Sequence, residues 1–264
     1  MDRVRSSSPV PQRLRLDGRR ALVTGAGQGI GRALAHALAD AGARVAVLDL
    51  VEERADSVVA ELKDKGTDAL ALAADIAADD AATRYVAAVM DAWGGLDIAV
   101  NNAGINRAAP AETMSARDWD DVFAVNLRGV FLGCQAEARV MLPRESGRIV
   151  NIASAASLVV PHPQKQVAYN VAKAGVVHLT RTLAAEWADR GIRVNCISPG
   201  TVRTPLITND DSLAPLVNQW IGQIPVGRLG EVTDLQAAVV YLASDACDYL
   251  TGHNLVIDGG ATLW

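Results

Sequence analysis

Arg20-Ala-Leu-Val-Thr24 runs directly into Gly25-Ala-Gly-Gln-Gly-Ile-Gly31, and this stretch decides the fold of the 264-residue chain. The first five residues have the apolar composition of a short buried strand, and a helical pattern follows from about Gly29 to Ala41. Glycines let the backbone turn sharply and let a pyrophosphate approach the first helical turn, where unpaired N–H groups favour an anion. The order of strand, glycine turn and helix therefore predicts a phosphate-binding unit, although a tight structural turn has the same pattern.

A second apolar strand, Arg44-Val-Ala-Val-Leu-Asp49, ends in a carboxylate 24 residues beyond Gly25. In a Rossmann unit, an acid in this position hydrogen-bonds the adenosine ribose hydroxyls. Asp49 would repel a 2′-phosphate, and neither Gln28 nor Leu50 carries a positive charge that could hold one. The sequence therefore predicts NAD as the cofactor in preference to NADP.

Apolar runs alternate with longer helix-period segments along the rest of the chain, which is typical of a parallel sheet. We expect a single-domain α/β Rossmann fold, with a doubly wound seven-stranded parallel sheet and helices on both faces. The strands are expected at Arg20 to Thr24, Arg44 to Asp49, Ala69 to Ala73, Ile98 to Asn101, Arg148 to Ile152, Arg193 to Ile197 and Asn254 to Asp258. The helices are expected to end near Ala41, Lys65, Trp93, Pro143, Arg190 and Leu242.

Composition indicates one cytoplasmic domain over residues 14–264, preceded by a flexible tail over residues 1–13. Half of the residues are hydrophobic, which suits parallel strands buried on both faces. A net charge of −5 without a lysine or arginine block argues against nucleic acid as the partner. No segment resembles a signal peptide or a membrane span. Cys134, Cys196 and Cys247 are widely separated, which favours reduced structural thiols.

Tyr169 and Lys173 stand four residues apart in Tyr-Asn-Val-Ala-Lys, fifteen and nineteen residues after Ser154. Positions i and i+4 of a helix share a face, so the phenol and the ammonium would project into the same space. A tyrosine acting as an acid/base near neutral pH needs its pKa lowered by about three units, or roughly 4 kcal/mol. A partly buried cation about 4 Å away could supply an interaction of that order. An ordinary amphipathic helix surface would show the same short pattern.

From about Leu16 to its C-terminus, the chain resembles the short-chain dehydrogenase/reductase family. Several independent motifs occur in the family's order, namely Thr24-Gly-Ala-Gly-Gln-Gly-Ile-Gly31, Asn101-Asn-Ala-Gly104, Ser154 with Tyr169-x-x-x-Lys173, and Pro199-Gly200 with Thr204. The resemblance implies hydride transfer between an alcohol carbon and NAD, in which Tyr169 exchanges the hydroxyl proton. Lys173 would lower the pKa of the tyrosine and hydrogen-bond the nicotinamide ribose, while Ser154 would orient the substrate.

The same resemblance implies two residue sets. The catalytic set is Asn126, Ser154, Tyr169 and Lys173. The cofactor-binding set is Gly25, Gln28, Gly29, Ile30, Gly31, Asp49, Asp75, Ile76, Asn102, Gly104, Tyr169, Lys173, Pro199, Gly200, Val202 and Thr204. No metal is expected, because the four histidines show no ligand spacing.

Some of these residues also suit purely structural roles. Asp75 would bind the adenine amino group by resemblance, but it also suits a helix N-cap. Asn126 lies in the apolar helical stretch Val122-Phe-Ala-Val-Asn-Leu127, where it would be either a satisfied core amide or the family's proton relay. Asn102 and Gly104 would serve equally as turn residues. Ser154 is preferred over Ser157 as the catalytic serine, because it directly follows the fifth strand.

Substrate choice is expected to depend on Val160-Pro-His-Pro-Gln-Lys-Gln166, where the approach to Tyr169 is longer than is commonest in the family. His162 is a candidate for the pocket mouth, and residues 204–220 match the family's substrate lid. Together with Leu183-Ala-Ala-Glu-Trp187 and Asp258-Gly-Gly-Ala-Thr-Leu-Trp264, this segment resembles the branch acting on sugar alcohols. The C-terminus also resembles members that form homotetramers.

Three alternatives to a polyol dehydrogenase stay open. The first is a dehydrogenase of another secondary alcohol. The second is a 3-oxoacyl-carrier-protein reductase, which Asp49 disfavours because such enzymes usually need NADPH. The third is a non-catalytic NAD-binding regulator, which could have lost Tyr169 or Lys173, although this chain retains both.

Overall fold

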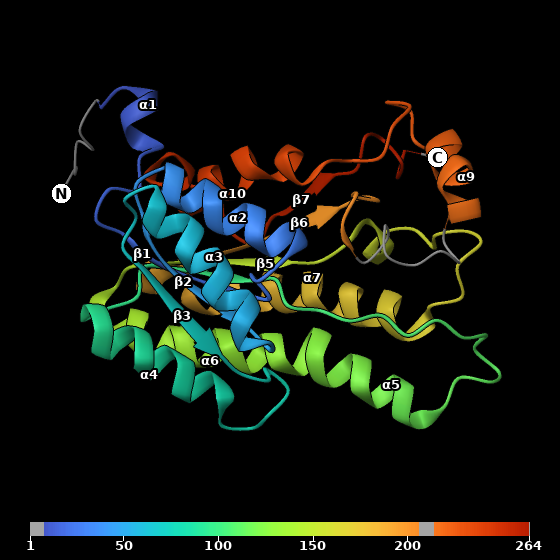
Figure 1. Cartoon of the computed structure of the whole chain (residues 1–264), viewed down its shortest axis with the longest axis horizontal. Helices are drawn as coiled ribbons and strands as arrows, with labels where there is room; N and C mark the ends of the chain where they lie inside the picture. Colours follow the sequence, from blue (N-terminus) through green and yellow to red (C-terminus); the bar gives the residue numbers. More distant parts are fainter. Residues whose placement is uncertain (1–7, 206–213, 264) are drawn as a thin grey trace.

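The computed structural model of the chain describes residues 8–205 and 214–263. Its seven strands form one all-parallel sheet in the order β3-β2-β1-β4-β5-β6-β7 (Figure 1). The strands are β1 (Arg20–Thr24), β2 (Arg44–Asp49), β3 (Ala69–Ala73), β4 (Ile98–Asn101), β5 (Gly147–Ile152), β6 (Ile192–Pro199) and β7 (Asn254–Ile257). The predicted strands are confirmed, with three differences at their ends. β5 begins one residue earlier than expected, β6 begins one residue earlier and ends two residues later, and β7 ends one residue earlier.

Helices cover both faces of the sheet (Figure 1). One face packs against α2 (Gly29–Asp40), α3 (Glu52–Asp64) and α10 (Gln236–Ala243). The other packs against α4 (Ala81–Trp93), α6 (Val130–Met141) and α7 (Val167–Trp187). The remaining described helices of eight residues or more are α5 (Ala116–Phe123) and α9 (Ala214–Gln223). The predicted doubly wound Rossmann fold is therefore confirmed.

Strand β1 shows why the sheet needs two helical layers. Ala21 and Val23 belong to the core shared with α2, whereas Leu22 belongs to the core shared with α4 and α6. All three side chains are fully buried. Removing a valine or leucine side chain from water stabilises the fold by about 1.5–3 kcal/mol, so a strand without polar alternation favours burial on both faces.

The strand order creates a crevice at one edge of the sheet. The chain builds β1, β2 and β3 outward in one direction, then returns to place β4 on the other side of β1. The connections leaving β1 and β4 therefore diverge to opposite sides, and ligands of such sheets bind at this switch point, beyond the carboxyl ends of the strands.

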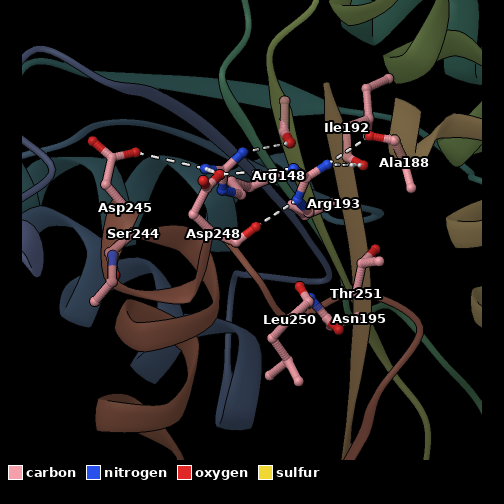
Figure 2. Close-up of polar contacts among 12 residues, drawn as sticks. Arg148, Ala188, Ile192, Arg193, Asn195, Ser244, Asp245, Asp248, Leu250 and Thr251 are labelled. Carbon is pink, nitrogen blue, oxygen red and sulfur yellow. Dashed lines mark hydrogen bonds and ion pairs between the residues drawn. The ribbon is translucent and has the colours of Figure 1, made fainter. Parts of the chain in front are cut away.

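Ion pairs join segments of the chain at the amino ends of the strands, on the side of the sheet opposite the crevice (Figure 2). Arg148 and Arg193 lie near the amino ends of β5 and β6, where both approach Asp248. Arg193 also donates to the backbone carbonyl oxygens of Asp248 at 2.7 Å and Ala188 at 2.8 Å. These contacts fasten the segment between α10 and β7 to the sheet, which leaves the other edge for ligands.

The described part of the N-terminal segment begins with a short helix. Within the tail expected over residues 1–13, Val10–Arg13 forms the short helix α1, with Pro9 as its N-cap residue and Pro11 in its single turn. A proline suits the first turn of a helix, because its missing N–H needs no partner there. Residues 1–7 lie outside the described part of the chain. Among residues 8–205 and 214–263, no helix is long and apolar enough to cross a membrane.

Candidate active site

The predicted site residues follow the carboxyl ends of six neighbouring strands. Gly25 follows β1, Asp49 ends β2, and Asp75 lies two residues beyond β3. Asn102 follows β4, Ser154 follows β5, and Gly200 follows β6. Because the strands are parallel, these positions, which span 175 residues of sequence from Gly25 to Gly200, lie along one edge.

The glycine turn between β1 and α2 has no room for a side chain at Gly25, Gly27 or Gly31. Gly25 has φ 61°, and a Cβ there would lie 2.7 Å from the Cα of Ala103. A Cβ on Gly31 would overlap the carbonyl oxygen of Gly25. The first N–H groups of α2, beginning at Gly29, therefore face a bare backbone turn, which fits a pyrophosphate.

Asp49 is positioned against this turn. The carboxylate is 6% exposed and accepts hydrogen bonds from the backbone N–H of Gly27 at 2.9 Å and Val51 at 3.1 Å. Asn102 braces the other side, because its side-chain amide donates to the carbonyl oxygens of Thr24 and Gly25, each at 3.0 Å. The turn is thus held from β2 and from β4, and Asn102 supports the cofactor site as a structural residue.

Asp75 does not cap a helix. Its carboxylate accepts from the backbone N–H of Ala77 at 2.9 Å, whereas α4 begins only at Ala81 with Asp80 as its N-cap residue. The N-cap alternative is therefore wrong, and the carboxylate instead stabilises the turn after β3. Ile76 beside it is 7% exposed, so it forms an apolar floor there.

Asn126 lies in a π-helix, Ala124–Gly129, between α5 and α6. Its side chain is fully buried and pairs with Ile105 twice: Nδ2 donates to the carbonyl oxygen, and Oδ1 accepts from the N–H, both at 2.8 Å. A Cβ on Gly104 would lie 3.3 Å from Asn126 Oδ1 and 3.5 Å from Lys173 Nζ. Asn126 is therefore a satisfied core amide that fixes the loop after β4 beside the lysine.

Ser154, Tyr169 and Lys173 meet at the end of β5. The side chain of Ser154 hydrogen-bonds the Tyr169 phenol. Lys173 is 3% exposed, lies with Nζ 5.8 Å from the centre of the Tyr169 ring, and donates to the carbonyl oxygen of Ile152 at 2.7 Å. The Ser157 hydroxyl instead donates to the carbonyl oxygen of Ser154 at 2.6 Å, which favours Ser154 as the partner of the tyrosine.

The loop after β6 closes the site. The N–H of Gly200 donates to Ile257 at 2.9 Å, and a Cβ there would lie 2.7 Å from the Cα of Asp258. Val202 is 5% exposed and pairs with Gly230. Thr204 approaches the glycine turn, since a Cβ on Gly29 would lie 3.7 Å from its Cβ. Of the expected lid over residues 204–220, residues 206–213 lie outside the described part.

Known proteins resemble this chain in sequence and fold over nearly its whole length. A family model described as Enoyl-(Acyl carrier protein) reductase matches residues 25–262. A short-chain type dehydrogenase/reductase of known structure from Mycobacterium marinum is 39% identical, with a TM-score of 0.93 over 96% of this chain and 99% of that one. The chain belongs to the short-chain dehydrogenase/reductase family.

Curated members of this family share its length. D-threitol dehydrogenase of Mycolicibacterium smegmatis is 46% identical over 94% of this chain and 95% of that protein. Galactitol 2-dehydrogenase of Rhizobium johnstonii is 41% identical over 96% and 98%. A gluconate 5-dehydrogenase from Burkholderia cenocepacia, solved with NADP and tartrate, is 37% identical with a TM-score of 0.90 over 97% and 100%. The chain is thus an oxidoreductase of the alcohol dehydrogenase/reductase type with a nicotinamide cofactor.

Burial shifts the pKa values of the tyrosine and the lysine in this short-chain dehydrogenase/reductase. Burial raises the pKa of Tyr169 above its ordinary value, and the hydrogen bond from Ser154 lowers it by less. Burial also lowers the pKa of Lys173 to about 8. Lys173 donates its ammonium to the carbonyl oxygen of Ile152, and burial is the main cause of the raised tyrosine pKa. Removing the phenolate from water dominates.

The sequence did not predict a buried polar cluster that lies near the candidate active site of this family member. Asn101 is buried, and its Nδ2 donates at 3.1 Å to both Glu137 Oε2 and Asn151 Oδ1. Asn151 in turn donates to Thr180 on α7 at 3.0 Å. Glu137 is fully buried. The available signal was a glutamate within the mostly apolar stretch of α6.

Proposed function

We propose that this short-chain dehydrogenase/reductase is an NAD-dependent dehydrogenase that interconverts a secondary hydroxyl of a polyol or sugar alcohol and the corresponding ketone. The observation that carries the proposal is the contact of Ser154 with Tyr169, beside buried Lys173, at the same sheet edge as Asp49. The similarity to D-threitol and galactitol dehydrogenases supports the substrate class.

The chemistry of the proposed oxidation follows from the positions of these groups. NAD, when bound, supplies the acceptor for the hydride that leaves the carbinol carbon. Tyr169 reacts as the phenolate, which takes the hydroxyl proton and becomes the phenol, so the substrate loses one proton and one hydride and becomes a ketone. Ser154 hydrogen-bonds the substrate oxygen, where it stabilises developing negative charge. Lys173 places a cation beside the phenol, and Asn126 keeps the loop bearing Gly104 against that cation.

Asp49 supports NAD as the preferred cofactor. Its carboxylate stands at the glycine turn, where a 2′-phosphate would meet a negative charge. Leu50, the next residue, is 68% exposed and uncharged. The side chain of Arg54 starts beside the same turn, because a Cβ on Gly27 would be 2.6 Å from its Cβ. The proposal is that Asp49 outweighs this arginine, since its carboxylate contacts the turn directly.

A substrate panel tests the proposed function. Purified protein would be incubated with NAD or NADP and with D-threitol, galactitol, butan-2-ol or a 3-hydroxyacyl thioester, while absorbance of the reduced cofactor is followed. We expect the highest kcat/KM with NAD and a polyol. The Tyr169→Phe variant controls for contaminating activity. Turnover confined to the thioester with NADP would instead establish a 3-oxoacyl reductase, and no turnover with any substrate would favour a non-catalytic regulator.

A homotetrameric, cytoplasmic enzyme is part of the same proposal. An apolar hollow of about 620 Å³ lies on α5, the π-helix, α6 and α7, where Phe123, Leu127, Phe131 and Leu179 contribute to its lining. Phe131 is 40% exposed there, which favours coverage by another subunit. The three cysteines are buried and unpaired with one another, which suits a reducing compartment. Sedimentation equilibrium would test the assembly, and a monomer at micromolar concentration would refute it.

A further inference from the structure

Two loops near Tyr169 are joined by a backbone bridge between Ala109 and Gln166. The first follows β4, and its Ile105 packs in the same apolar cluster as Tyr169. The second precedes α7 and ends at Gln166, one helical turn before Tyr169. The N–H of Ala109 in the first loop donates to the carbonyl oxygen of Lys165 in the second at 2.9 Å. The backbones therefore hold the two loops together as one wall beside the tyrosine.

Side-chain amides continue this connection. Asn106 Nδ2 donates to Gln166 Oε1 at 3.0 Å, and Gln166 Nε2 donates to Asn170 Oδ1 at 2.9 Å. Gln166 is 9% exposed, so the middle of the chain of amides is shielded from water. Asn106 directly follows Ile105, whose two backbone groups are both held by Asn126. The position of Asn106 is consequently fixed from both sides.

The wall holds two buried acceptors without donors. Asn106 Oδ1 and Gln164 Oε1 are both inaccessible to water and have no hydrogen-bond partner among the residues that the structure describes. A buried amide oxygen without a partner is unfavourable, and most such groups in proteins are paired. An amide oxygen only accepts, so the complementary ligand must offer O–H or N–H donors.

We propose that Asn106 and Gln164 form a hydroxyl-binding subsite beside Tyr169: when an acyclic polyol binds, rotation of these side chains turns their buried amide oxygens toward the substrate, where they accept hydrogen bonds from its non-reacting hydroxyls. The inference rests on the proposed polyol dehydrogenase function and assigns residues to its specificity. The subsite lies outside the catalytic set, since Asn106 and Gln164 are distinct from Ser154, Tyr169 and Lys173.

The chemistry of these acceptors selects among the candidate substrates. A polyol carries hydroxyl donors on the carbons next to the reacting one. A simple secondary alcohol has no donor besides its reacting hydroxyl, and the carboxylate of a sugar acid would face two carbonyl dipoles that repel it. A site built to pair with substrate hydroxyls rejects analogues that lack them, because its buried polar groups then stay unpaired. Asn106 and Gln164 therefore favour uncharged, multiply hydroxylated substrates.

The test is a double-mutant-type cycle, in which a substitution in the enzyme is combined with the removal of hydroxyls from the substrate. kcat/KM with NAD would be measured for D-threitol, butane-2,3-diol and butan-2-ol, using wild type, Asn106→Leu and Gln164→Met. Both substitutions keep side-chain size while removing the acceptor. Gln12→Met, an exposed change in α1, is the matched control. We expect the ratio of kcat/KM for D-threitol over butan-2-ol to fall about tenfold or more in each site variant and to stay at the wild-type value in the control.

The outcomes separate the two levels of the proposal. Failure of wild type to oxidise any polyol would overturn the proposed function. Polyol oxidation by wild type, with threitol-to-butanol ratios in both site variants within twofold of wild type, would overturn the subsite alone. Circular dichroism and NADH fluorescence titration establish that each variant is folded and binds cofactor. If one variant does not fold, the other still completes the comparison. If neither folds, the wild-type enzyme decides: a kcat/KM that is no higher for D-threitol than for butan-2-ol refutes the subsite.

Discussion

Replacing Glu137 by glutamine should make the protein more stable at neutral and alkaline pH. The glutamate is fully buried on α6, where Oε2 accepts from Asn101 at 3.1 Å. Its Oε1 has no hydrogen-bond partner among the described residues. Burial raises the pKa of Glu137 from 4.5 to about 8, and the hydrogen bond from Asn101 offsets only part of that rise. Tyr85 on α4 and Cys134 on α6 are the neighbouring titratable groups, and both stay neutral because burial raises their pKa values.

The magnitude follows from linkage between protonation and folding. Between pH 4.5 and pH 8, folded Glu137 keeps a proton that the unfolded chain has released. The protonated carboxyl therefore favours the folded state. This contribution of Glu137 to stability is fully present below pH 4.5, falls as pH rises, and is lost above the folded pKa. Each pH unit in this window costs about 1.4 kcal/mol, which amounts to roughly 3 kcal/mol between pH 5 and pH 7. Glutamine is uncharged throughout and retains an acceptor for Asn101.

Chemical denaturation across pH would measure the effect. Unfolding free energies of wild type and Glu137→Gln would be determined in urea at pH 5.5, 7 and 8.5 by circular dichroism. The variant's advantage should grow with pH and reach roughly 3 kcal/mol near pH 7, equivalent to about 6–12 °C in melting temperature. Glu53→Gln, an exposed change in the first turn of α3, is the matched control. Parallel pH profiles for wild type and Glu137→Gln would refute the reasoning, because they would mean that the carboxyl titrates equally in both states.

Three further substitutions address catalysis, cofactor choice and stability. Tyr169→Phe should lower kcat by roughly 10²–10⁴-fold while leaving NADH binding intact, and normal turnover would disprove its acid/base role. Asp49→Asn should reduce the kcat/KM ratio of NAD over NADP about tenfold or more; an unchanged ratio would place cofactor choice elsewhere. Asp97 is 5% exposed between Arg20 at 2.7 Å and Arg144 at 2.6 Å, which hold its pKa well below the ordinary value. Asp97→Asn should therefore cost about 3 kcal/mol in urea denaturation at pH 7, with the deficit shrinking below about pH 4, and a deficit that does not change with pH would contradict the ionic explanation.

The strands and the glycine turn were predictable because their signals are local. Leu22 and Val23 lie in an apolar run that only a strand buried on both faces explains, and Gly25 and Gly31 stand where any side chain would collide. The π-helix around Asn126 had no comparable signal, because the same apolar residues suit an ordinary helix. Its extra turn residue is stabilised by the pairing of Asn126 with Ile105, a contact across 21 positions.

The sequence by itself determined the order of strands and helices and the position of the glycine turn. It also determined which chemical groups the candidate site holds: the acid at the end of β2, and a serine, tyrosine and lysine in the family's order. Only the tertiary structure decided how those groups behave. It shows that burial raises the pKa of Tyr169 and lowers that of Lys173, and it aligns Asn106 with Gln166. A pKa and a hydrogen bond depend on distance and on access to water, and these are set by packing between segments far apart in the chain.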